Sequence, residues 1–334
     1  MIHLRIVVPD SLSERTLDML CAADAVSSVV HLRGAAQKPA GDVLLADVAR
    51  EDASVILSAL RELGVHELGT IAIEEIDTAI SRAAAQAEKS AKGLPSDAVV
   101  WEEVEARTSE NVELGGSFLA FMSLAMLIAA VGVMTGSTIL IIGAMIVGPE
   151  FGPLAGLCVA IVERRRNLAA RSLRALAVGF PVGMTFTLAA TALMRWTGIA
   201  PDSIVATAHP ITRFITHPDQ FSVIVAAAAG IAGILSLTST KSGALIGVLV
   251  SVTTIPAAAN AGVAVAYGNW DQWRGANEQL LLNVAMIVIF GVLTLYTQRR
   301  LYIARRRRSL ASDYRRAAGL PADRTTSGTI MIRR

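Results

Sequence analysis

Hydrophobic and polar positions divide the chain into two parts with different patterns. Up to residue 76, short apolar runs of strand length alternate with amphipathic helical segments, and from residue 115 long apolar segments follow one another. In the first part, the pattern predicts strands at 3–9, 27–34, 41–50 and 69–76, and helices at 13–26 and 52–65, the first opened by Ser13. This order, βαββαβ, predicts an α+β ferredoxin-like domain over residues 1–76.

Long apolar segments fill the chain from residue 115 onward. Six of them come close to or exceed the ~20 residues that a helix needs to cross a hydrocarbon core of ~30 Å. They cover residues 117–134, 137–162, 173–194, 221–237, 243–267 and 280–296. We therefore expect an α-helical integral membrane domain of six spans over residues 115–298. A helical linker over residues 77–114 precedes this domain, and a basic cytosolic tail over residues 299–334 follows it.

Arginine and lysine indicate how the predicted spans are oriented. Basic residues gather in ERRRNLAAR after the second span, in TSTKSG after the fourth and in QRRLYIARRRRSL after the sixth. The positive-inside rule places these regions and the N-terminal domain in the cytosol. The composition also indicates a membrane protein, since 53% of the 334 residues are hydrophobic, 17% are charged and the mean hydropathy is +0.52. We expect a multi-pass protein of the plasma (cytoplasmic) membrane, the cell inner membrane, with both termini cytosolic.

Helix-breaking residues lie at the centres of the second and fifth predicted spans. The second span contains Pro149 and Pro153, each preceded by a glycine, and the fifth contains Pro256. A weak alignment of the two spans brings Pro153 within one residue of Pro256. An odd number of spans per half reverses the direction of the second half, so we expect a 3+3 inverted repeat with broken helices. Non-helical backbone at this depth persists where it is buried in protein or lines a wet cavity.

The two breaks and the polar residues near them form a candidate site for a substrate or an ion. Proline leaves the carbonyl four residues earlier without its helical donor, and glycine lets a ligand approach the main chain. Freed carbonyls can hold a cation, whereas the N-terminus of a half-helix can hold an anion. Ordinary kinks in membrane helices are the alternative interpretation. The candidate residues are Gly148, Pro149, Glu150, Gly152, Pro153, Thr253, Thr254, Pro256, Asn260 and Asn283.

Glu150 is the one acid within the six predicted spans. A charged residue at the centre of a membrane helix costs ~2.5 to 3.5 kcal/mol on insertion scales, so its presence calls for a partner or a function. Arg174, Arg195 and Lys241 all lie near the ends of predicted spans. Glu150 therefore suits a group that takes up and releases a proton or binds a mobile cation. The alternative is a protonated acid that is hydrogen-bonded inside the helix bundle.

The sequence shows no pattern that is typical of an active site, a metal site or a cofactor site. No nucleophile with a base, no clustered set of His, Cys and carboxylates, and no phosphate-binding glycine loop stands out, so we expect no enzyme, no metal site and no cofactor. Membrane orientation accounts for the arginine clusters, so we expect no nucleic acid as a partner. Small residues in the spans and the ferredoxin-like domain favour a homo-oligomer, with a dimer as the default.

Several stretches carry a resemblance to a known family. They are MIHLRIVVPDSL, GDVLLADVARE, DAVVWEEVEARTSE and, above all, STILIIGAMIVGPEFGPLAG. In these stretches the chain resembles the bacterial family called domain of unknown function 389, a group of hydrophobic membrane proteins. Within this family it resembles an actinobacterial branch. The resemblance extends over almost the whole chain and implies a cytosolic N-terminal domain on a multi-span membrane domain, with no settled activity. Many members have an apolar residue at the position of Glu150, which limits any role of Glu150 to this branch.

Two functions of different classes fit these features. The first is a membrane transporter or channel for an ion or small solute, with a midplane site between the broken second and fifth spans and a regulatory cytosolic domain. The second is a membrane-anchored oligomeric sensor or scaffold, in which the soluble domain binds a ligand or partner and nothing is transported. The lipid bilayer is a partner in both.

Overall fold

The computed structural model forms two compact units, which we describe separately. The first combines Met1–Glu103 with Gln298–Arg334, and the second is Val104–Thr297. The predicted boundaries at residues 76, 114 and 298 stay predictions. The structure describes the whole chain except residues 77–78, 92–98, 102–103, 105–107, 110–111, 202–218, 240–252, 310–312 and 321–334.

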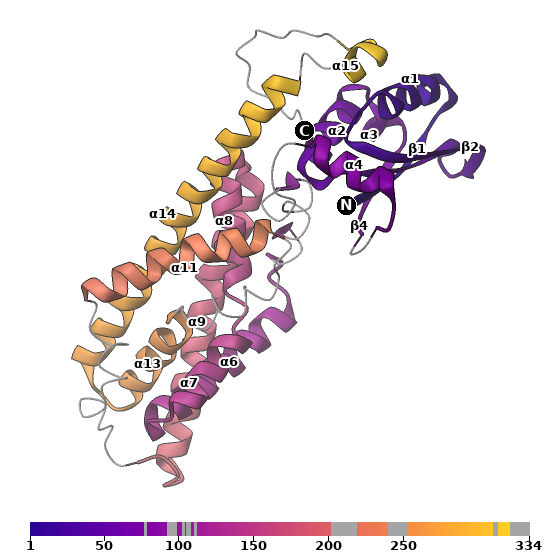
Figure 1. Ribbon diagram of the computed structural model, residues 1–334. Coiled ribbons are helices and arrows are strands. Elements are labelled where there is room, and N and C mark those ends of the chain that lie inside the picture. Colours follow the sequence, from indigo (N-terminus) through magenta and orange to yellow (C-terminus); the bar gives the residue numbers. More distant parts are fainter. Residues whose placement is uncertain are drawn as a thin grey trace. The chain divides into compact units, whose positions relative to one another are not determined.

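The first unit contains a four-stranded antiparallel sheet with strand order β2-β3-β1-β4. Three of its strands, β1, β2 and β4, are labelled in Figure 1. Its strands and two longer helices follow the order βαββαβ along the chain, as predicted. The elements are β1 (Ile2–Val8), α1 (Asp10–Cys21), β2 (Val26–Gln37), β3 (Ala40–Val48), α2 (Arg50–Glu62), the short α3 (Val65–Leu68), β4 (Thr70–Glu75) and α4 (Arg82–Ser90).

The predicted boundaries of the first helix, which ends at Cys21 rather than at residue 26, and of the turn before β3 are wrong. Helix α1 begins at Asp10 rather than at Ser13, because Pro9 already has the extended N-cap conformation and Asp10 places an acid in the first turn. The turn between β2 and β3 is also shorter than predicted, since pairing of the two strands continues to Gln37 and Ala40. The long hairpin that results brings β2 residues close to α1.

The core of the first unit follows the alternation of side chains along its strands. Ile2, Leu4 and Ile6 of β1 are fully buried, and in β3 the residues with even numbers from 42 to 48 are buried. These side chains pack against apolar residues of both helices, such as Met19 and Ile56. Since successive side chains of a strand point to opposite faces, one face of the sheet carries the core.

Part of the predicted basic tail packs on the first unit. The carbonyl of Ala318, directly after α15 (Asp313–Ala317), accepts hydrogen bonds from Arg15 Nε at 3.2 Å and Nη2 at 3.0 Å. Arg315 Nη2 also donates to Glu62 Oε2 at 2.6 Å, and its side chain is buried. A segment near the end of the chain is therefore tied to the N-terminal domain.

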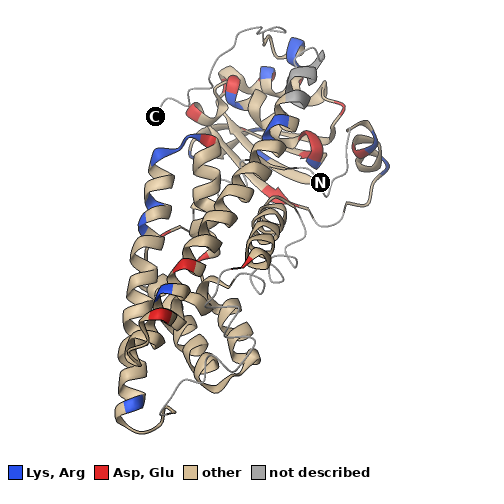
Figure 2. Cartoon of the chain, turned by 90° about the vertical axis from the view of Figure 1, so that its left-hand side faces the viewer, with Lys and Arg blue, Asp and Glu red and all other residues tan. Residues whose placement is uncertain are grey.

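The second unit is built from apolar helices, and charged side chains are sparse along them (Figure 2). In the described part of the chain, four helices are long and apolar enough to cross a membrane, and a bent pair raises the number to five. The long helices are α6 (Gly116–Thr135), α9 (Arg166–Trp196), α11 (Gln220–Thr238) and α14 (Trp270–Ser309), and the bent pair is α7 (Thr138–Val147) with α8 (Phe151–Glu163).

The fifth predicted span is seen only in part. Its described portion is α13 (Thr254–Ala266), which has 13 residues, and the predicted residues 243–252 lie outside the described part of the chain. Six spans and an inverted repeat therefore stay predictions.

Helix α13 is enclosed by other helices of the second unit. Every residue from Thr254 to Ala264 is buried. Gly262 permits close packing on α9, because a Cβ atom there would lie 2.8 Å from the carbonyl oxygen of Met184. Such close approach of backbones is the role that small residues have in membrane helix packing. A helix that is buried on all sides is the natural place to look for an internal site.

Candidate functional site

The break predicted in the second span is present between α7 and α8. Helix α7 ends at Val147, α8 begins at Phe151, and the two axes are bent by 49°. Pro149 has no N–H, so the carbonyl of Met145 loses its donor in the helical pattern, and the extended Gly148 ends α7. The chain therefore changes direction at Gly148, Pro149 and Glu150, where the sequence predicts it.

The other two prolines of the predicted site do not interrupt helices. Pro153 is the third residue of α8 and Pro256 is the third residue of α13. The first N–H groups of a helix have no intrahelical acceptor, so proline is tolerated there. The break in the second span is therefore shorter than the predicted one from Gly148 to Pro153, since Gly152 and Pro153 lie within the first turn of α8. Pro256 likewise marks the beginning of a helix.

Glu150 lies at the N-terminus of α8 and faces the N-terminus of α13. Its side chain is buried, with 2% of the residue exposed, and its Oε1 accepts a hydrogen bond from Thr254 Oγ1 at 2.7 Å. Its Oε2 has no hydrogen-bond partner among the described residues. An unpaired buried acceptor costs ~1 to 3 kcal/mol, more when it is charged. The carboxyl group is thus placed for a further ligand.

Gly148 leaves the space that this carboxyl group uses. A Cβ atom on Gly148 would lie 2.3 Å from Glu150 Oε2 and 2.7 Å from Ile255 Cγ1. Real Cβ atoms do not approach other atoms so closely, so any larger residue displaces one of the two side chains. Glycine at position 148 is therefore required by the arrangement of the break and α13.

Amide side chains connect the start of α13 to α14. Asn283 Nδ2 donates to Thr253 Oγ1 at 2.8 Å, and Gln279 Nε2 donates to Asn283 Oδ1 at 3.2 Å. Asn260 lies further along α13, where its Oδ1 accepts from Gln272 Nε2 at 3.0 Å. The structure thus gathers Gly148, Glu150, Thr253, Thr254 and Asn283 at one place and puts Asn260 at another.

Gln272 and Gln279 were not among the predicted site residues. Both are buried and lie on the face of α14 that carries Asn283. The predicted sixth span began at residue 280, the first residue of an apolar run, and therefore excluded them. Gln279 and Asn283 follow Gln272 by 7 and 11 residues, a spacing that places all three on one face of a helix. This spacing was the signal in the sequence that could have identified the two glutamines.

The electrostatic surroundings of the break suit a Glu150 carboxyl group that carries either one negative charge or one proton. Glu150 lies at the N-termini of two helices, α8 and α13, whose dipoles favour an anionic group by ~0.3 to 1 kcal/mol each. None of the ion pairs between described residues includes Glu150, so no described cation neutralises it. The described residues also contain no group of three His, Cys, Asp or Glu side chains placed for a metal ion.

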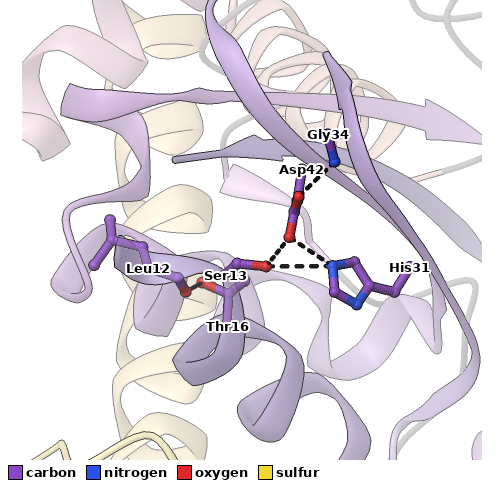
Figure 3. Close-up of polar contacts among 6 residues, drawn as sticks. All are labelled: Leu12, Ser13, Thr16, His31, Gly34 and Asp42. Atoms are coloured by element: carbon purple, nitrogen blue, oxygen red, sulfur yellow. Dashed lines mark hydrogen bonds and ion pairs between the residues drawn. The ribbon is translucent and has the colours of Figure 1, made fainter. Parts of the chain in front are cut away.

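A second polar cluster lies in the N-terminal domain (Figure 3). Ser13 Oγ of α1 donates to Asp42 Oδ2 at 2.5 Å, His31 Nε2 lies 2.7 Å from the same oxygen, and Gly34 N donates to Oδ1 at 2.7 Å. The Ser13 hydroxyl, followed by the other donors, lowers the pKa of Asp42 to about 2. The hydroxyl donates to the carboxylate, so His31 does not activate it as a nucleophile.

Comparisons with known proteins cover the region of the break. Residues 145–289 match the family described as "Domain of unknown function (DUF389)". An uncharacterized protein of Methanocaldococcus jannaschii is 25% identical over 198 residues, which are 58% of this chain and 59% of that protein. The match thus spans about three fifths of the relative's length. No solved structure matches the chain. The comparisons support the resemblance to this family, and the bacterial, actinobacterial branch stays a prediction.

Proposed function

We propose that this chain is a multi-pass membrane transporter or channel for an ion or small solute, with its site at the break between α7 and α8. The observation that carries the proposal is the environment of Glu150. Its carboxyl group is buried among apolar helices, one oxygen is held by Thr254, and the other has no partner among the described residues. Ionisable residues inside membrane helices are costly and commonly mark ion, proton or substrate paths.

Two short helices support a repeated architecture for this site. Helices α8 and α13 have 13 residues each, and each carries proline as its third residue. Glu150 directly precedes α8, and Thr253 directly precedes α13. In transporters with inverted repeats, broken helices at corresponding places of the two halves form the midplane site. This correspondence favours the proposed 3+3 repeat of six spans.

The remaining parts of the proposal concern the cytosolic side. Basic loops and tail favour an orientation with both termini in the cytosol, and the small residues of the apolar helices favour a homo-oligomer. The N-terminal domain has the element order of a ferredoxin-like domain and would regulate transport. If no solute moves, the same domain would instead serve a membrane-anchored sensor or scaffold.

Flux measurements on the purified, full-length protein test the proposal. Proteoliposomes are screened with protons, Na⁺, K⁺, chloride and small neutral solutes, first with the unaltered protein and then with Glu150→Gln. Glu278→Gln is the matched control, because Glu278 is exposed on α14. We expect one species to move, a loss of at least ~10-fold in Glu150→Gln, as for removal of one catalytically placed charge, and normal flux in Glu278→Gln. Unchanged flux in Glu150→Gln would contradict the proposed site.

A further inference from the structure

Several buried polar atoms near α13 have no hydrogen-bond partner in the described part of the chain. They are Glu150 Oε2 at its beginning, Gln279 Oε1 on α14, Asn260 Nδ2 within α13, and the hydroxyl groups of Thr187 and Thr191 on α9. Buried polar groups of folded proteins are nearly always paired, often with ordered water. An accumulation of unpaired donors and acceptors around one helix therefore indicates that water enters there.

Three buried amide side chains lie along one face of α14 and form the α14 amide stripe, with Ala276 between the first two. Gln272, Ala276, Gln279 and Asn283 are all buried and lie at helical spacing. The stripe faces α13, because Gln272 contacts Asn260 and Asn283 contacts Thr253. With a rise of 1.5 Å per residue, the 11 residues from 272 to 283 extend over roughly 16 Å, about half of a hydrocarbon core.

The two ends of this stripe differ in exposure. At one end, Asn269 is exposed and its amide exchanges hydrogen bonds with Gln272 at 3.3 and 3.1 Å. At the other end, the stripe reaches Thr253, next to the hydrogen-bonded pair of Thr254 and Glu150. One turn beyond Asn283, the same face of α14 continues with the apolar Ile287. The polar face thus leads from an exposed residue to the buried carboxyl group and stops there.

The chemistry of the stripe suits a proton and disfavours a multivalent ion. An amide both donates and accepts, so it can orient water molecules without binding a charge tightly. Among the described residues, Glu150 lies at the N-terminus of α13, and Arg195 and Tyr267 lie at its C-terminal end. A single carboxyl group balances one positive charge. A multivalent ion would lack sufficient countercharge in this environment.

We propose that water along the α14 amide stripe carries protons between the Asn269 end and Glu150. A proton enters from a hydronium ion at Asn269. Each step breaks one O–H bond and forms another on the next water, and the last step protonates the Glu150 carboxylate. The net change is the movement of one proton, with no oxidant or reductant. This inference rests on the proposed transport function and names its transported or coupled ion.

Proton flux gives the first test. Liposomes containing a trapped pH-sensitive dye receive the full-length protein, and a valinomycin-clamped potassium gradient drives proton entry. We expect Gln279→Met and Gln272→Met to lower proton flux by roughly 100-fold or more, the scale of losing one proton-transfer partner. Asn277→Leu is the matched control, since Asn277 lies on α14 and bonds only to Trp273 of its own helix among the described contacts. Normal proton flux in both Met variants would overturn the inference.

Thiol accessibility gives a second test that does not depend on flux. In a background with Cys21→Ser and Cys158→Ala, the variants Gln279→Cys, Gln272→Cys and Ile287→Cys are exposed to a small water-soluble methanethiosulfonate reagent in liposomes. We expect modification of Q279C and Q272C and protection of I287C. Protection of Q279C and Q272C would show a dry stripe and overturn the inference, even where the Met variants fold poorly.

The outcomes separate this inference from the function on which it rests. If Na⁺ or a neutral solute moves and depends on Glu150 while proton flux is absent, the transport function stands and the proton path is wrong. If no species moves in the unaltered protein, both are wrong.

Discussion

The sharpest structural prediction concerns two glycines of α7 and its C-terminal end, Gly143 and Gly148. A Cβ atom on Gly143 meets no atom within 4 Å, whereas a Cβ atom on Gly148 would lie 2.3 Å from Glu150 Oε2 and 2.7 Å from Ile255 Cγ1. Gly143→Ala therefore gains the helix propensity of alanine, ~0.8 to 1 kcal/mol. Gly148→Ala forces a buried side chain to move, which costs ~1 to 3 kcal/mol. We expect the two variants to differ by about 2 to 4 kcal/mol in unfolding free energy.

Unfolding of both variants by SDS titration in mixed micelles measures this difference. Gly143→Ala should unfold at a higher SDS fraction than the unaltered protein, and Gly148→Ala at a lower one. The same Gly148→Ala protein should also lose the flux that depends on Glu150, because the displaced carboxyl group no longer meets Thr254. Equal stability of the two variants would refute the close contact between Gly148, Glu150 and Ile255 from which the site is built.

Three further predictions address other contacts. Thr254→Val should lower the unfolding free energy by ~1 to 3 kcal/mol, because Glu150 Oε1 loses its donor, and Thr254→Ser should restore most of it in the same titration. Arg315→Ala should release α15 from the rest of the first unit and speed its cleavage by chymotrypsin. Arg315→Lys should have the smaller effect, because the bond to Glu62 at 2.6 Å is charge-assisted and lysine keeps the positive charge. The hydrogen bond from Ser13 lowers the folded-state pKa of Asp42 to about 2, below the value of an unfolded aspartate. Its contribution to stability is therefore present above pH ~4 and is lost as the pH falls toward 2. Pepsin should therefore cleave residues 26–48 of Asp42→Asn faster than those of the unaltered protein at pH 4, and the difference should shrink by pH 2.

The features that the sequence predicted depend on local chemistry. The strands of the first unit follow from alternating side chains, and the break before α8 follows from Pro149, whose effect on its own helix needs no other part of the chain. The boundary at Ser13 failed because a hydroxyl residue four positions into a helix resembles an N-cap. Its actual partner, Asp42, belongs to a distant strand.

The features that were missed depend on contacts between distant segments. Gln279 is a polar residue beside an apolar run, and only its pairing with Asn283, which in turn contacts α13, reveals that it is buried. Pro153 was expected to break a helix because the sequence alone does not show that α8 begins two residues before it. In both cases the residue type was informative, and its position relative to a helix end or a neighbouring helix decided its role.

Currents from proteoliposomes on a solid-supported membrane test the central claim most directly. The unaltered protein and Glu150→Gln are compared at equal protein density during rapid steps in pH and in the concentration of each monovalent ion. We expect a transient or steady current from the unaltered protein for at least one of these steps. This current should be lost in Glu150→Gln and unaffected in Glu278→Gln. Identical currents from the unaltered protein and Glu150→Gln would contradict the claim that Glu150 at the break is the working group.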